Sequence, residues 1–145
     1  LEMTLTAEQY SELELARNFL SHTCPGGSWA DIISVLAKKF NQRGLAYLHL
    51  SEPDWAGGPA HTDEFRQALR AEFAGVIIGE GGYTLEKADT LLDKGYIDAA
   101  AFGRPYIANP DLAHRLKLNV PLNTLNPATL YGGGAEGYTD YPAMA

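Results

Sequence analysis

Several features that are common in proteins are scarce in this sequence. It contains one cysteine, Cys24, which excludes an intrachain disulfide and a cysteine-based metal cluster. Basic residues number 11 against 18 acidic ones, giving a formal net charge of −7 at pH 7. Because a nucleic-acid binder needs a basic surface to displace counterions from phosphates, we expect no nucleic-acid partner. The acidic balance also argues against binding to an anionic membrane surface.

Long apolar runs are missing as well. No stretch approaches the ~20 apolar residues of a membrane span, and no basic start followed by an apolar segment marks a signal peptide. Together with the single cysteine, these absences predict a soluble cytoplasmic protein with no membrane partner. The 145 residues, 46% of them hydrophobic, suit one globular domain. They fall short of the ~250 residues of a complete eight-stranded (β/α) barrel.

Short apolar strands alternate with amphipathic helices from residue 45 onward. The predicted strands cover 45–50, 76–78 and 97–102, and the predicted helices that follow them cover 62–73, 84–94 and 109–116. Two further helices are predicted before the first strand, over 6–21 and 28–40. Alternation of this kind predicts an α/β fold with about three parallel strands and flanking helices. The last helix is expected to begin at the pair Asn109-Pro110, as N-cap and first-turn residues.

Glycines gather where two of these strands end. Gly79-Glu80-Gly81-Gly82 follows the second strand, and Gly103-Arg104 follows the third. Ligands of parallel α/β folds lie at the carboxyl ends of the strands, and glycine lets the backbone approach an anion closely. Arg104 adds a forked donor that matches phosphate. Either loop alone could be a tight strand-to-helix turn, but the pair on consecutive strands favours a phosphate site.

Acidic and histidine side chains offer other candidates. Glu52, Asp54 and Asp63 share one loop region, which suggests a metal or acid–base site, although a solvated acidic loop with helix-capping roles is favoured. We expect His49 to be a hydrogen-bonded core residue of the first strand. His61 and His114 are expected to be solvated helix residues.

Four segments carry a resemblance to a known family: 46–55, 77–84, 101–112 and 131–142. They resemble the C-terminal part of the old yellow enzyme family of NADH:flavin oxidoreductases. The similarity is greatest to its bacterial N-ethylmaleimide and pentaerythritol-tetranitrate reductase branch. It covers about residues 41–142, whereas 1–40 form a helical segment that does not match. We therefore divide the chain into 1–40 and a partial barrel over 41–145.

The resemblance implies the end of a (β/α)8 barrel that holds FMN. Such an ene-reductase is reduced by NADH or NADPH and passes hydride to an activated alkene or nitro compound. Gly81, Gly82, Gly103 and Arg104 match the family's FMN-phosphate loops. Tyr131 and Trp55 match residues on the substrate side of the flavin.

The family's catalytic histidine pair has no counterpart in this sequence. Family members carry His-x-x-Asn or His-x-x-His, and none of the four histidines here has that spacing, so no catalytic residue is assigned. The alternative function is a non-catalytic module that binds FMN or phosphate, or that self-associates. Because three parallel strands cannot close a barrel, we expect a homo-oligomer that completes the open sheet.

Overall fold

The computed structural model describes residues 11, 29–131 and 134–144. The chain forms two compact units, the first ending at Ala100 and the second running from Ala101, and each is described by itself. The predicted helix over 6–21 lies outside the described residues, apart from Ser11. The predicted division at residue 41 stays a prediction. Helix α2 (Trp29–Gln42) packs against α3 (Asp63–Glu72) within the first unit.

Threonines begin the two helices that connect the strands, as their positions in the sequence predict. The Thr62 hydroxyl accepts a hydrogen bond from the Phe65 amide at the start of α3, at 3.3 Å. The Thr84 hydroxyl does the same for the Lys87 amide at the start of α4 (Leu85–Asp93), at 3.2 Å. Each cap satisfies one of the amides that a helix start leaves without an internal partner.

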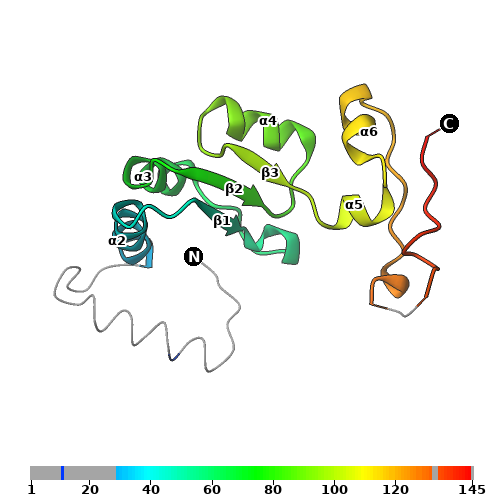
Figure 1. The fold of residues 1–145 in the computed structure, drawn as a ribbon, viewed down its shortest axis with the longest axis horizontal. Coiled ribbons are helices and arrows are strands. Elements are labelled where there is room, and N and C mark those ends of the chain that lie inside the picture. Colours follow the sequence, from blue (N-terminus) through cyan, green and yellow to red (C-terminus); the bar gives the residue numbers. More distant parts are fainter. Residues whose placement is uncertain (1–10, 12–28, 132–133, 145) are drawn as a thin grey trace. The chain divides into compact units, whose positions relative to one another are not determined.

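Three strands form one sheet in the order β1-β2-β3, with β1 at Tyr47–Ser51, β2 at Val76–Glu80 and β3 at Ala99–Ala101 (Figure 1). Strands β1 and β2 are parallel, in a register that pairs Tyr47 with Val76 and Ser51 with Glu80. The predicted α/β class, with three parallel strands and flanking helices, is confirmed. Strand β3 is shorter than predicted.

The two faces of the sheet differ in burial. Ile77 is fully buried, as is Phe73 at the end of α3, so the face that carries Ile77 packs against the helices. The opposite face carries Tyr47 and Val76, which are 55% and 44% exposed. His49 lies on this open face and is exposed, so its predicted place in the core is wrong. Strand residues alternate between faces, and the apolar run around His49 did not reveal which face would be covered.

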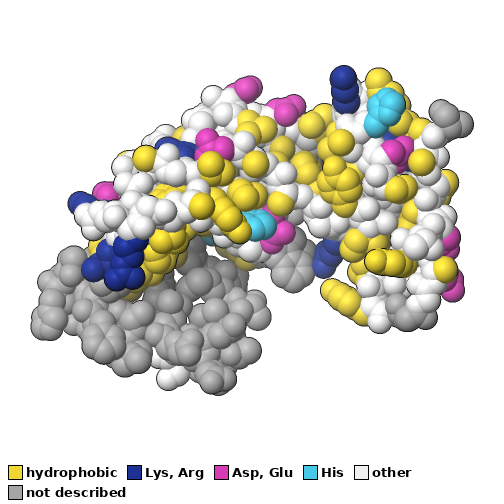
Figure 2. Space-filling view, viewed as in Figure 1, with side chains coloured by type: hydrophobic (Ala, Val, Ile, Leu, Met, Phe, Trp, Pro, Cys, Tyr) yellow, Lys and Arg dark blue, Asp and Glu magenta, His cyan; other side chains and the backbone are white. Residues whose placement is uncertain are grey.

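In the space-filling view, hydrophobic side chains are visible over the region of the strands (Figure 2). Among the described residues, no helix is both long enough and apolar enough to cross a membrane.

The second unit contains α5 (Arg104–Ala108), α6 (Leu112–Leu118) and a short 3-10 helix, η2 (Pro127–Thr129). The prediction that Asn109-Pro110 begins α6 is wrong, because Asp111 is its N-cap. Asn109 is buried and its side chain is used elsewhere. It donates to the Pro105 carbonyl (2.8 Å) and accepts from the Asn123 amide (2.7 Å). His114 is exposed on α6, as predicted.

Candidate functional site

The carboxyl ends of β1 and β2 lie at the same edge of the sheet. Glu52 directly follows β1, and its amide donates to the Glu80 carbonyl at the end of β2, at 2.9 Å. This bond continues the ladder by one residue. It brings Glu52, and Asp54 in the 3-10 helix η1 (Pro53–Ala56), next to Gly81 and Gly82.

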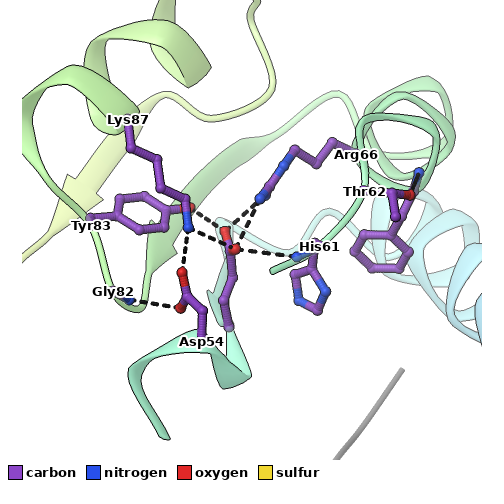
Figure 3. Close-up of polar contacts among 9 residues, drawn as sticks. Asp54, His61, Thr62, Arg66, Gly82, Tyr83 and Lys87 are labelled. Carbon is purple, nitrogen blue, oxygen red and sulfur yellow. Dashed lines mark hydrogen bonds and ion pairs between the residues drawn. The ribbon is translucent and has the colours of Figure 1, made fainter. Parts of the chain in front are cut away.

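Glu52 is the centre of a buried polar cluster. Figure 3 labels its partners Arg66, Tyr83 and Lys87. The Glu52 side chain is 1% exposed, and both Nη atoms of Arg66 donate to its two oxygens, at 2.8 and 2.9 Å. The Tyr83 hydroxyl donates to Oε1 at 2.5 Å, and Lys87 Nζ lies 3.2 Å from Oε2. The His61 amide also donates to Oε2, at 3.3 Å. A buried carboxylate with this many donors is held in one position.

The ionisation states follow from these contacts. Burial alone raises the pKa of Glu52, but hydrogen bonds from Arg66 and Tyr83 outweigh it and lower the pKa to about 2. The pKa of Tyr83 is raised, first by burial and then by its bond to Glu52. Burial lowers the pKa of Arg66, but Glu52 outweighs this effect and the net shift is upward. At neutral pH the cluster therefore combines a carboxylate, a guanidinium and a protonated phenol.

Asp54, in η1, contacts the glycine loop that follows β2. Its Oδ1 accepts from the Gly82 amide at 2.7 Å, and its Oδ2 lies 2.5 Å from Lys87 Nζ. The Lys87 ammonium also stands 4.4 Å from the centre of the Tyr83 ring. Gly81 has a φ of +155°, and a Cβ there would collide with Asp54 Oδ1 and lie 2.9 Å from Glu52 Cβ. The glycine is thus required by the approach of the two acidic residues.

The prediction of a solvated acidic loop is therefore wrong for Glu52, which is buried against Arg66. It holds better for Asp63, which is exposed at the start of α3 and pairs with Lys94 at 2.7 Å. The alternative of a metal site has no structural support, since no group of three or more potential metal ligands occurs among the described residues. His61 is not a helix residue as predicted. It precedes α3, half-buried, with its ring 4.6 Å from that of Phe65.

The remaining predicted residues are divided between the two units. Gly103 and Arg104 begin α5 in the second unit, where a Cβ on Gly103 would meet nothing within 4 Å. Tyr131 is in the same unit and is 98% exposed. Trp55 belongs to η1 in the first unit. A phosphate site that uses both glycine loops stays a prediction.

Sequence reasoning missed Arg66, Tyr83 and Lys87. A signal for Arg66 was present, because it shares a helical stripe with Leu69 and Phe73 at spacings of three and seven. A charged residue on a buried stripe needs a partner of opposite charge. The stripe could not say which acidic residue that partner was.

Comparison with known proteins shows which family the chain belongs to. The NADH:flavin oxidoreductase / NADH oxidase family matches residues 19–123, which is more than half of the chain. The chain belongs to this family. The match takes in residues 19–40, which the sequence resemblance had left outside.

Individual relatives agree with the family. The chain is 37% identical over 112 residues to 12-oxophytodienoate reductase 2 of Arabidopsis thaliana, covering 75% of this chain and 30% of that protein. Among solved structures, morphinone reductase is 45% identical with a TM-score of 0.75, over 81% of this chain and 32% of the other. The old yellow enzyme of Trypanosoma cruzi is 36% identical with a TM-score of 0.71, over 80% and 30%.

The resemblance to the old yellow enzyme family is confirmed by these matches. The chain spans less than a third of the length of each of these three relatives. Its sheet is a fragment of the barrel found in the family's structures.

Proposed function

We propose that this chain supplies the FMN-phosphate end of an oxidoreductase of the old yellow enzyme type. The redox chemistry of such a protein comes from bound FMN, which carries hydride from NADH or NADPH to an activated alkene or nitro compound. Relatives of this chain carry the names 12-oxophytodienoate reductase and morphinone reductase, which fits an electrophilic small-molecule substrate.

One observation carries the proposal: a backbone amide in the loop after β2 and a lysine at the start of α4 already hold a carboxylate. The Gly82 amide and the Lys87 ammonium both bind the Asp54 carboxylate. Backbone amides and a cation are the donors that a phosphate requires, so the donor set fits the phosphate of FMN. In this proposal Gly81, Gly82, Gly103 and Arg104 contribute to binding of the FMN phosphate, as the family resemblance implies. Trp55 and Tyr131 would line the substrate side.

FMN uptake tests the proposal. Purified protein mixed with FMN should remain yellow after unbound FMN has been removed by gel filtration. Arg104→Ala should weaken FMN binding by about 1.5–3 kcal/mol, the usual contribution of a hydrogen bond to a charged group. Isothermal titration calorimetry measures the difference. Arg43→Ala is the matched control, because Arg43 is an exposed arginine that follows α2.

Two results would contradict this function. A protein that is colourless once the excess FMN has been removed by gel filtration has retained no flavin. Equal losses of affinity in Arg104→Ala and Arg43→Ala would mean that Arg104 does not contact the phosphate. If FMN binds, anaerobic addition of NADPH should bleach the flavin absorbance.

A second candidate function is a non-catalytic module that binds FMN or associates with itself. It is favoured by the open face of the sheet, where Tyr47 and Val76 are exposed, and by β1, which has a neighbour on one side only within the described sheet. An unpaired strand edge with exposed apolar side chains favours pairing with another strand. We propose a second copy of the chain as that partner.

Analytical ultracentrifugation separates the two candidates when combined with the bleaching assay. A concentration-dependent dimer that binds FMN but is not bleached by NADPH supports the module. Tyr47→Lys, which puts a charge on the open face, should shift the protein towards the monomer. A monomer at all concentrations excludes self-association through this face.

A further inference from the structure

The Gly82 amide and the Lys87 ammonium are the donors that we assign to phosphate, yet both are engaged by Asp54. This contact is between an acidic side chain and an anion site of the same chain. Two anions cannot use the same donors, because like charges at hydrogen-bond distance repel strongly in a partly buried site. A phosphate that binds here therefore has to replace the carboxylate.

We propose that Asp54 is an internal occupant of the phosphate site, which a phosphate group must displace in order to bind. The inference rests on the proposed function in that it concerns the same loop, Gly81-Gly82. It adds a regulatory contact: the chain holds its own anion in place when no phosphate is present.

The charges of the cluster support exchange at Asp54 in particular. Glu52 and Asp54 face Arg66 and Lys87, so the four charges balance. If the Asp54 carboxylate leaves, the cluster has one net positive charge beside a free amide. That combination attracts an anion.

The two acidic residues differ in how firmly they are held. Glu52 is buried and receives donors from four residues, among them both Nη atoms of Arg66. Asp54 has the Gly82 amide and Lys87, and its side chain is 17% exposed. Of the two carboxylates, Asp54 is therefore the one that can move into solvent while Glu52 keeps Lys87 in place.

The local backbone suits such a movement. Asp54 lies in η1, a single turn that ends at Gly57 with a φ of +84°. Gly58 follows directly, and glycines allow the widest range of backbone angles. A short 3-10 turn next to two glycines can shift without disturbing β1.

The test uses inorganic phosphate as the probe and the Gly82 amide signal in 1H–15N NMR spectra as the readout. Asp54→Asn keeps the shape of the side chain and removes its charge. We expect its Gly82 amide to respond to phosphate with an affinity at least about tenfold higher than in the unmodified protein. Asp63→Asn, an exposed acidic residue paired with Lys94, is the matched control and should behave like the unmodified protein.

The outcomes are separable. Equal phosphate affinity in the unmodified protein and Asp54→Asn, or no response of Gly82 in either, overturns the inference. Asp54→Ser removes the charge with a smaller side chain and has to give the same result as Asp54→Asn, which keeps the test decisive if one variant folds poorly.

Failure of the proposed function looks different. A gain of phosphate binding in Asp54→Asn without FMN uptake supports the internal occupant and removes the flavin function. Loss of FMN affinity in Arg104→Ala, together with no effect of Asp54→Asn on phosphate or FMN, leaves the flavin function and removes the occupant.

Discussion

Two buried arginines are used in different ways in the two units. Arg66, in the first unit, directs both Nη atoms to one carboxylate, Glu52, and its Nε has no hydrogen-bond partner among the described residues. Arg115, in the second unit, directs its three nitrogens to three separate groups. These are the Asp111 carboxylate (2.7 Å), the Pro121 carbonyl (2.9 Å) and the Pro142 carbonyl (3.0 Å).

The difference shows what each arginine does. Arg115 ties together segments that are distant in the sequence, using carbonyls that need a donor wherever they are buried. Arg66 neutralises Glu52. Glu52 also accepts hydrogen bonds from Tyr83, which directly follows Gly82, and from Lys87. The first unit therefore contains a group of interacting charges next to the proposed ligand site. In the second unit, Arg115 connects separate chain segments through hydrogen bonds. Changes at each site should differ in size and in pH dependence.

The largest effect is expected for Glu52→Gln. An amide cannot accept from both Nη atoms and the Tyr83 hydroxyl as a carboxylate does, so Arg66 is left buried with an uncompensated charge. Breaking a buried ion pair on one side costs about 3–5 kcal/mol of unfolding free energy. Urea unfolding at neutral pH measures the loss, and hydrogen exchange of the β2 amides assigns it to the first unit.

Glu86→Gln is the matched control, since Glu86 is exposed in the first turn of α4. It should change the unfolding free energy by less than about 0.5 kcal/mol. Equal losses in the two variants would show that Glu52 contributes no more than a surface carboxylate does.

Lowering the pH should reveal the same contribution of Glu52 to stability. The pKa of Glu52 lies at about 2, below its ordinary value of 4.5, so its ionised form stabilises the fold above pH 4.5. That contribution is lost as the pH falls from 4.5 towards 2, and linkage puts it at about 3 kcal/mol. Unfolding free energies measured across this range should fall steeply in the unmodified protein and less steeply in Glu52→Gln. Parallel curves for the two proteins would place the acid sensitivity elsewhere.

The fold could be predicted further than the site. The predicted helix ranges begin at Thr62 and Thr84, which are the N-caps of α3 and α4, and such a cap depends only on residues three positions away. The strands were found because their apolar runs are short and bounded by glycine. The start of α6 was missed because the Asn109 side chain does not cap the helix. It accepts a hydrogen bond from the Asn123 amide, fourteen residues further along the chain, which no local sequence pattern could predict.

The cluster around Glu52 could not be predicted for the same reason. Its members come from the end of β1, from α3 and from α4, and only the register of β1 and β2 brings them together. The glycines at 81 and 82 were predicted to let the backbone approach a phosphate, and this stays a prediction. The group that approaches Gly82 in this structure is Asp54, which the sequence had suggested was a solvated residue.

Arg115→Ala should cost less than Glu52→Gln, because water can reach the groups it leaves behind. Removing a charged donor typically costs about 1.5–3 kcal/mol. Hydrogen exchange should place the loss at the end of the chain, at the Met144 amide that donates to Asp111 and among the residues near Pro142. Arg115→Lys keeps the charge but supplies one point donor instead of three, so it should recover less than half of the loss. Full recovery with lysine would mean that charge alone, and not the three separate contacts, holds the second unit together.

The smallest effect concerns how one helix in each unit ends. Gly95, after α4, has a φ of +68°, and Asn119, after α6, has a φ of +53°. A Cβ on Gly95 would meet nothing within 4 Å, so Gly95→Ala isolates the cost of the left-handed backbone, about 1 kcal/mol. Gly95→Asn should cost less, because asparagine tolerates this conformation, as Asn119 does. Thermal unfolding of the two variants measures the difference, and equal losses would show that backbone strain does not distinguish the two helix ends.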